Sequence, residues 1–318
     1  MPLKRILLAE PAGFCAGVKR AVDMLDQALQ DLDTPIYCYR ELVHNRQVIE
    51  QFTARGVRFV ENLSEVPVAA VLVFSAHGVS PALLAEASQR QLRVIDATCP
   101  FVARIHSKVR QFVAEGHLVF LVGHRGHDEV RGVIGEAPGS VLVIENPDEA
   151  EDIQVPQGIP VALVTQTTLS ISDTEKTVSV LCRRFPKLAT LPQSDICSAV
   201  RSRQIAVRRL ASLVKHVLVL GAQNSSNSLR LVEVAREAGA NATLISSLDD
   251  LQKLPWQDMD AVGITAGAST PDSFIQAVIE EIKRPDGAVI FSVGVSCIDS
   301  ETQRTSVTSG NTNECLHK

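Results

Sequence analysis

The sequence predicts an α/β fold made of three similar units, each with a small, mostly parallel sheet. Apolar runs alternate with helical patterns along the chain, and the runs are unbroken stretches rich in valine, leucine and isoleucine. Strands that helices cover on both faces have this composition, which is typical of parallel sheets. The number of units follows from a repeat, because one order of segments occurs three times.

Each repeat opens with a cysteine that leads into a helical pattern. The three cysteines stand 84 and 98 residues apart, in the segments GFCAG, ATCP and DICSA: Cys15, Cys99 and Cys197. Glycines mark predicted helix ends at Gly56, Gly116 and Gly239. Three such units would bring three thiols to one centre. This pattern suggests a metal or iron–sulfur site with one position left open.

Two polar loops complete each repeat, and each loop follows an apolar run. The first loops hold residues that lie 28 to 30 positions after the cysteines: His44, His127 and Asn227. The second loops, SAHGVS, TQTTLS and TAGAST, hold His77, Thr167 and Ser269. Parallel sheets bind ligands beyond the carboxyl ends of their strands, and these small, hydroxyl, amide and imidazole residues suit anions. The loops therefore predict a cradle for a phosphate or diphosphate.

The repeat also sets the expected domain organisation. We place the boundaries near the cysteines, which gives α/β domains over residues 1–98, 99–193 and 194–290. Residues 291–318 end in a polar stretch without periodicity, and we expect them to form a mobile tail.

The overall composition and charge argue against two classes of binding partner, nucleic acids and membranes. The chain has 318 residues, of which 45% are hydrophobic and 21% charged, as in an ordinary globular protein. A formal net charge of −5 provides no basic field for nucleic acid. No segment approaches the length of a membrane span, and the apolar run near the N-terminus is too short for a signal-peptide core. We therefore expect a cytoplasmic protein that binds neither nucleic acid nor membrane.

We expect no direct role in ligand binding or catalysis for the remaining cysteines and histidines. Seven cysteines in a cytosolic protein are not expected to form a disulfide set, and those outside the repeat are Cys38, Cys182, Cys297 and Cys315. Structural zinc is disfavoured, because the candidates contain no Cys-x-x-Cys or His-x-x-x-His pair. Histidines outside the polar loops are expected to be structural: His106, His117, His216 and His317. His124 shares a loop with His127, and we expect it to support that loop.

Two adjacent carboxylates stand in one of the polar loops. Glu129 follows His127 by two residues, and burial in a ligand-lined cavity would raise its pKa and make it an acid. A solvated loop carboxylate is an equally good interpretation of the sequence, and Asp128 is a rival for the role. Thr167 and Thr168 end a strand, where a hydroxyl either holds a substrate oxygen or caps the next helix.

Together these motifs resemble a known family. GFCAGVKRAV, ELVHNR, FSAHGVS, DATCP, GHRGHDE, TQTTLS, DIC, NSSNS and TAGASTP occur in fixed order over about residues 5–285. This set is similar to that of the 4-hydroxy-3-methylbut-2-enyl diphosphate reductases, the IspH/LytB family. The resemblance implies a trefoil of three pseudo-symmetric α/β domains around a [4Fe–4S] cluster. It also implies reductive removal of an allylic hydroxyl to give isopentenyl and dimethylallyl diphosphate, the last step of the non-mevalonate (MEP) isoprenoid pathway.

The resemblance assigns roles residue by residue. Cys15, Cys99 and Cys197 would hold three irons, and the fourth iron would be open to substrate. The implied diphosphate ligands are His44, His77, Ser225, Asn227 and Ser269, with Ser226 beside them. His127 would lie near both the diphosphate and the reacting end, Glu129 would deliver protons, and Thr167 would help to place the hydroxyl. The implied electron donor is a protein such as ferredoxin or flavodoxin.

Two departures from the family pattern keep other functions in view. Val200 and Arg201 follow DICSA, where the family more often has a threonine after the alanine, and the C-terminus after Phe291 is unlike the usual family ending. The alternatives are a cluster-containing sensor or binding paralogue without turnover, and a zinc-dependent hydrolase of a phosphorylated substrate.

Overall fold

The computed structural model describes residues 5–191, 195–256, 259–283 and 289–294. The chain forms two units that are each compact. Of the described residues, the first unit contains those up to Val18, His44–Val48 and those from Ser198 onward, and the second contains those within Lys19–Val43 and Ile49–Cys197.

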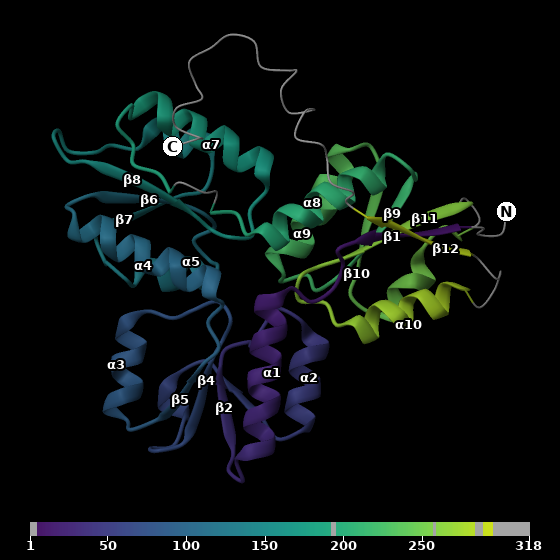
Figure 1. The fold of residues 1–318 in the computed structure, drawn as a ribbon, viewed down its shortest axis with the longest axis horizontal. Coiled ribbons are helices and arrows are strands. Elements are labelled where there is room, and N and C mark those ends of the chain that lie inside the picture. Colours follow the sequence, from purple (N-terminus) through teal and green to yellow (C-terminus); the bar gives the residue numbers. More distant parts are fainter. Residues whose placement is uncertain (1–4, 192–194, 257–258, 284–288, 295–318) are drawn as a thin grey trace. The chain divides into compact units, whose positions relative to one another are not determined.

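The first unit contains a five-stranded sheet in the order β10-β9-β11-β1-β12, and every pairing in it is parallel (Figure 1). Its strands are β1 (Arg5–Glu10), β9 (His216–Leu220), β10 (Asn241–Ile245), β11 (Ala261–Ala266) and β12 (Val289–Gly294). Its helices are α8 (Ser198–Ala211), α9 (Ser226–Glu237) and α10 (Asp272–Lys283), with a 3₁₀ turn, η2, over Leu248–Lys253.

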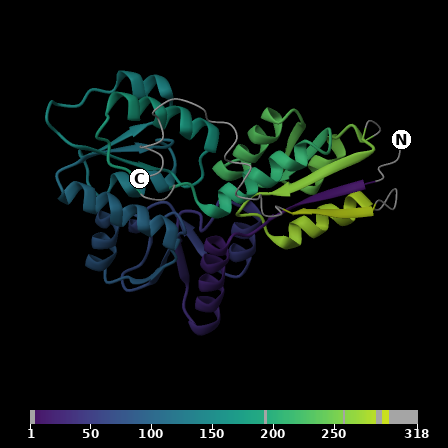
Figure 2. The same cartoon turned by 45° about the horizontal axis from the view of Figure 1, so that its top comes forward.

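Helices cover both faces of this sheet, as its continuous apolar strands require. Leu218 of β9 packs in one core with Phe274 and Val278 of α10, whereas Val217 packs in a second core with Leu210 of α8 and other residues of α8 and α9. Figure 2 shows α10 on the opposite side of the sheet from α8 and α9. Successive side chains of a strand point to opposite faces, so each strand contributes to both cores.

The second unit contains two smaller parallel sheets, in the orders β3-β2-β4-β5 and β7-β6-β8. The first has β2 (Ile36–Tyr39), β3 (Arg58–Val60), β4 (Val71–Phe74) and β5 (Arg93–Asp96), and the second has β6 (Leu118–Val122), β7 (Val141–Ile144) and β8 (Val161–Thr165). The main helices are α1 (Ala16–Asp31), α2 (Arg46–Ala54), α3 (Pro81–Gln89), α4 (Pro100–Ala114), α5 (Asp128–Ile134), α6 (Pro147–Asp152) and α7 (Ile171–Arg184). Helices α1 and α2 begin in the first unit and continue into the second.

The sheet of β6, β7 and β8 is buried on both faces. Val119 packs with Ile105 and other residues of α4 and α5, and the next residue, Phe120, packs with Leu181 and other residues of α7. Phe120 is fully buried, and burying a side chain of this size contributes about 1.5–3 kcal/mol. These apolar contacts hold the carboxyl ends of the strands, and the loops that follow them, in place.

The predicted fold class is confirmed, since the described residues form three parallel sheets with helices. The three predicted helix-end glycines, Gly56, Gly116 and Gly239, all have positive φ, a conformation that glycine adopts without strain. One strand differs from the expected division into thirds, because β1 pairs with β11 and β12. The ends of the predicted domains stay predictions. Residues 295–318 of the predicted tail lie outside the described residues, and 289–294 form β12.

None of the helices in the described part of the chain combines the length and hydropathy that a membrane crossing requires.

Candidate functional site

The three repeat cysteines share one backbone environment. The N–H of each cysteine donates to a carbonyl in a second polar loop: Ala268 for Cys15 (3.0 Å), Ala76 for Cys99 (3.0 Å) and Thr167 for Cys197 (3.1 Å). These acceptors are the predicted loop residues themselves or their immediate neighbours. Each cysteine is therefore fixed to a loop that carries predicted ligand-binding side chains, and the repeat seen in the sequence is also a structural repeat.

The same cysteines stand at the starts of helices. Cys15 precedes α1, Cys99 is the N-cap of α4, and Cys197 precedes α8. Val18 donates its N–H to the Sγ of Cys15 at 3.4 Å. All three thiols are partly exposed, and none forms a disulfide. Positive helix ends favour thiolates, which are ligands for soft metals and for iron–sulfur clusters.

The first unit collects one group of predicted anion ligands. Ser225 caps α9, its Oγ accepting the N–H of Ser228 at 3.3 Å, and Ser269 donates its hydroxyl to the carbonyl of His44 at 3.0 Å. Asn227 is only 4% exposed, and neither side-chain amide atom has a hydrogen-bond partner among the described residues. Buried polar groups are nearly always satisfied, so the Asn227 amide indicates a place for a polar ligand.

Glycines bring this group close together. A Cβ atom at Gly221 or Gly267 would lie 2.2 or 2.1 Å from the Ser228 Oγ, so neither position accepts a side chain. Ser228 is fully buried and its hydroxyl donates to the Ser225 Oγ at 3.0 Å. Ser228 was not among the predicted site residues, although it stands in the NSSNS segment beside them.

The second unit brings His77 and His127 together. Their rings are perpendicular, with centroids 5.9 Å apart. His127 caps α5, and its Nδ1 accepts the N–H of Glu129 at 3.2 Å, so the neutral ring carries its proton on Nε2. The Nδ1 of His77 lies 3.2 Å from the Ser75 Oγ, which also accepts the His77 N–H. Both rings can therefore present an Nε2–H donor to an anion.

Glu129 lies in the interior, 2% exposed. Its Oε1 accepts the N–H of Thr167 at 2.8 Å, and its Oε2 accepts the Thr167 hydroxyl at 2.9 Å. Burial raises the pKa of Glu129 to about 7, although the two hydrogen bonds from Thr167 oppose the shift. The carboxyl thus holds a proton close to neutral pH and can release it to a group beside Thr167.

A second buried carboxyl, Asp195, anchors the loop that leads to Cys197. Its Oδ2 accepts the N–H of Thr165 at 3.0 Å, at the end of β8. Burial raises the pKa of Asp195 to about 7, an effect that Arg104 opposes and Glu129 reinforces. The sequence motif DIC pointed to this segment, but no role was predicted for its aspartate.

His106 is the buried histidine that sequence reasoning left without a role. It is 5% exposed, and its Nδ1 lies 2.7 Å from the Glu136 Oε1. A Cβ atom at Gly78 or Gly132 would come within 3.0 or 3.1 Å of its ring, so it packs beneath both the His77 loop and α5. Its place on the buried face of α4, with Val102, Ile105 and Val109, was the available signal.

The supporting role predicted for His124 has a structural counterpart. The His124 N–H donates to the Gln166 Oε1 at 2.9 Å, which ties the loop of His127 to the loop of Thr167.

Val200, where the sequence departs from the family pattern, is 3% exposed on α8.

The predicted site residues fall into two groups. The first unit holds Cys15, His44, Ser225, Ser226, Asn227 and Ser269, and the second holds His77, Cys99, His127, Glu129, Thr167 and Cys197. The first group combines one thiol at a helix start with donors suited to an anion, and the second combines two such thiols with donors of this kind. The assembly of both groups into one site stays a prediction.

Known proteins are similar to this chain in sequence and in fold. The "LytB protein" family matches residues 6–283. Proteins named 4-hydroxy-3-methylbut-2-enyl diphosphate reductase from Acidothermus cellulolyticus and Tropheryma whipplei are 45% and 43% identical, covering 88% and 93% of this chain and 82% and 95% of their own. The structure of the E-1-hydroxy-2-methyl-but-2-enyl-4-diphosphate reductase from Plasmodium falciparum is 32% identical, with a TM-score of 0.89 over 92% of each chain. The chain therefore belongs to the LytB protein family.

Proposed function

We propose that the chain is a 4-hydroxy-3-methylbut-2-enyl diphosphate reductase, an oxidoreductase of isoprenoid biosynthesis. It removes the allylic hydroxyl of (E)-4-hydroxy-3-methylbut-2-enyl diphosphate and forms isopentenyl and dimethylallyl diphosphate, the last step of the non-mevalonate pathway. The names of relatives that it matches over most of its length support this function. The observation that carries it is the buried Glu129–Thr167 pair, since loss of a hydroxyl as water needs an acid.

The diphosphate ligands are proposed from the loops described above. The Nε2–H donors of His77 and His127 suit phosphate oxygens, and the buried amide of Asn227 would donate one N–H to them. Ser225, Ser226, Ser269 and His44 would complete the cradle. Binding the diphosphate fixes the position of the reacting end, which lowers the barrier without any contact to the bond that breaks.

Proton delivery is assigned to Glu129 through Thr167. When Glu129 is protonated on Oε2, its O–H donates to the Thr167 hydroxyl, whose own proton then points to the substrate oxygen. A proton passes along this short chain without exposing the carboxyl to water. Because burial keeps the pKa of Glu129 near 7, its carboxyl still carries a proton to donate near neutral pH.

The cofactor that fits the thiols is an iron–sulfur cluster. Three partly exposed cysteines at helix starts suit a cluster, and the candidate ligands include no Cys-x-x-Cys or His-x-x-x-His pair of the zinc type. We propose a [4Fe–4S] cluster held by Cys15, Cys99 and Cys197. Such a cluster would supply single electrons and a Lewis-acidic iron. A small redox protein such as ferredoxin or flavodoxin is the proposed electron donor, and the cytoplasmic location expected from the sequence stays a prediction.

Metal and sulfide content with an anaerobic spectrum tests this function first. We expect brown protein with about four irons and four sulfides per chain, which converts the allylic alcohol diphosphate when a strong reductant is supplied. Colourless protein with stoichiometric zinc would contradict the proposal. Brown protein that binds the substrate without converting it would instead support a sensor or binding protein.

The cysteine assignment has a matched control within the chain. Cys99→Ser should lose both cluster and activity, whereas Cys182→Ser, at a partly buried thiol on α7, should keep both. Iron and sulfide analysis of the two variants, purified side by side, gives the comparison. A Cys99→Ser protein with its full iron content would remove Cys99 from the ligand set.

A further inference from the structure

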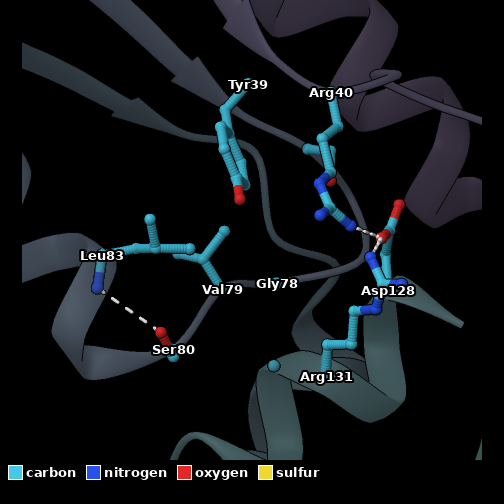
Figure 3. A pocket seen from close by; sticks show the side chains of 10 residues that line it. Tyr39, Arg40, Gly78, Val79, Ser80, Leu83, Asp128 and Arg131 are labelled. Atoms are coloured by element: carbon cyan, nitrogen blue, oxygen red, sulfur yellow. Dashed lines mark hydrogen bonds and ion pairs between the residues drawn. The ribbon is translucent and has the colours of Figure 1, made fainter. Parts of the chain in front are cut away.

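Arg40 and Asp128 form an ion pair between the two sheets of the second unit. Arg40 follows β2, and Asp128 is the first residue of α5, 88 positions further along the chain. The guanidinium bonds directly to the Asp128 carboxylate, and Arg131 approaches the same carboxylate oxygen at 3.9 Å (Figure 3). Arg40 and Asp128 side chains are 25% and 21% exposed, so water screens the pair only in part.

The pair lines a pocket of about 140 Å³. Ser75 and Gly78, which flank His77 in its loop, belong to the same lining. Figure 3 shows the Arg40 guanidinium and the Arg131 side chain converging on Asp128 from different elements. Asp128 itself stands between His127 and Glu129 in the chain.

The position of Asp128 conflicts with the task of its neighbours. His127 and His77 are predicted to hold a diphosphate, and a bare carboxylate next to them would repel that anion. At partly buried positions such repulsion reaches a size that changes affinity by an order of magnitude. A cation bonded to the carboxylate removes most of the repulsion.

Arg40 is held in an unusual backbone conformation at this point. Its φ is 55°, in the left-handed region that few non-glycine residues adopt, and its N–H donates to the Val60 carbonyl at 2.8 Å. Non-glycine residues with such strain concentrate at functional sites. The conformation directs an arginine from the end of β2 to the first turn of α5.

We propose that Arg40 is a positioning residue for diphosphate binding, which acts by neutralising Asp128 beside His127. The inference rests on the proposed function, because it assumes that the His77 and His127 loops receive the diphosphate. Arg40 would thus affect the affinity for the diphosphate without contacting it. A simple mechanical clamp between β2 and α5 is the competing explanation, and the two differ in what removal of the aspartate does.

Binding of inorganic diphosphate to the anaerobic holoenzyme, measured by titration calorimetry, separates these explanations. Arg40→Gln should weaken binding by about tenfold, and Arg40→Lys should retain most of the affinity. The double variant Arg40→Gln with Asp128→Asn should recover to within about threefold of the wild type, since the unneutralised charge is gone. A clamp predicts that the double variant binds no better than Arg40→Gln, and that result would overturn the inference.

Two further proteins make the test decisive. Arg55→Gln removes an arginine from a comparable pair with Asp26, and it should leave diphosphate binding unchanged; equal losses in Arg55→Gln and Arg40→Gln would overturn the inference. Asp128→Asn alone should bind at least as tightly as the wild type, and weaker binding would contradict neutralisation even if Arg40→Gln fails to fold. Wild-type protein that neither binds diphosphate nor turns over would refute the proposed function, whereas an active wild type with a failed variant cycle refutes this inference alone.

Discussion

Two adjacent carboxylates at the start of α5 have opposite surroundings. Asp128 faces a pocket lined by Arg40 and Arg131 and pairs with both. Glu129 turns into the protein, where both of its oxygens accept hydrogen bonds from Thr167 and where no cation among the described residues forms an ion pair with it. The first environment holds a charged carboxylate, and the second favours a neutral one, because burial without a cation penalises the ion.

The difference shows how two neighbouring residues in one helical turn can have different roles. Successive residues of a helix point about 100° apart, so a solvent-facing position and a core-facing position can be neighbours in the chain. Asp128 contributes a fixed charge that must be neutralised, and Glu129 contributes a proton. The segment GHDE contains both carboxylates, and their burial and their partners distinguish them.

The largest expected effect comes from exchanging the acid. Glu129→Gln keeps the shape and can still bond to Thr167, but it has no proton to deliver. We expect the cluster and substrate binding to survive and kcat to fall by about 10²–10⁴-fold. Asp128→Asn should lower kcat by less than about tenfold. Anaerobic turnover of both variants tests the contrast, and it fails if Asp128→Asn is the more damaging change.

The same exchange should alter stability in a pH-dependent way. Glu129 keeps its proton to about pH 7 in the folded protein, against 4.5 ordinarily, so the folded state binds more protons and wild-type stability falls as pH rises between these values. The full difference is about 3 kcal/mol. Glu129→Gln has no such loss of stability. Between pH 4.5 and pH 8, its free energy of unfolding should therefore rise relative to that of the wild type by up to this amount.

Urea denaturation of cluster-free protein at both pH values measures this gain. Asp195 titrates in the same range in both proteins, and Glu129 helps to raise its pKa, so the gain includes the effect of Glu129 on Asp195. A stability difference that does not change with pH would show that Glu129 is ionised throughout.

A smaller effect should follow from removing one hydrogen bond. The Thr167 hydroxyl lowers the pKa of Glu129, so Thr167→Val should raise that pKa further. We expect kcat to fall by about tenfold, as the relay loses its middle member. The rate of the wild type should decline above about pH 7, where Glu129 loses its proton, and this decline should move to higher pH in the variant. An unmoved profile would separate Thr167 from the acid.

Local patterns were sufficient to predict much of the fold. The alternation of apolar runs and helical stretches gave the parallel α/β class, and glycines at Gly56, Gly116 and Gly239 marked turns that need positive φ. The pairing of β1 with β11 and β12 could not be predicted in this way. It joins segments more than 250 residues apart, and a strand's own sequence does not specify which distant strand it will pair with.

The site was predictable to the extent that it follows the repeat. The equivalent loop positions and cysteines share the same backbone hydrogen bonds, as their spacing suggested. The burial of Glu129 was not predictable from GHDE, because it depends on Thr167, 38 residues away. The Arg40–Asp128 pair and the place of His106 under Gly78 likewise depend on contacts between different elements.

The account rests on Glu129 being a neutral acid where Asp128 is an ion, and its protonation can be observed directly. Infrared difference spectra of cluster-free protein, recorded as pH is raised from 5 to 9, should show a carboxylic-acid C=O band of Glu129 that disappears near pH 7. Glu129→Gln should lack this band and keep only the corresponding band of Asp195. If the wild-type spectrum shows no such band beyond those of Glu129→Gln above pH 5, Glu129 is already ionised. The contrast between the two carboxylates would then be wrong.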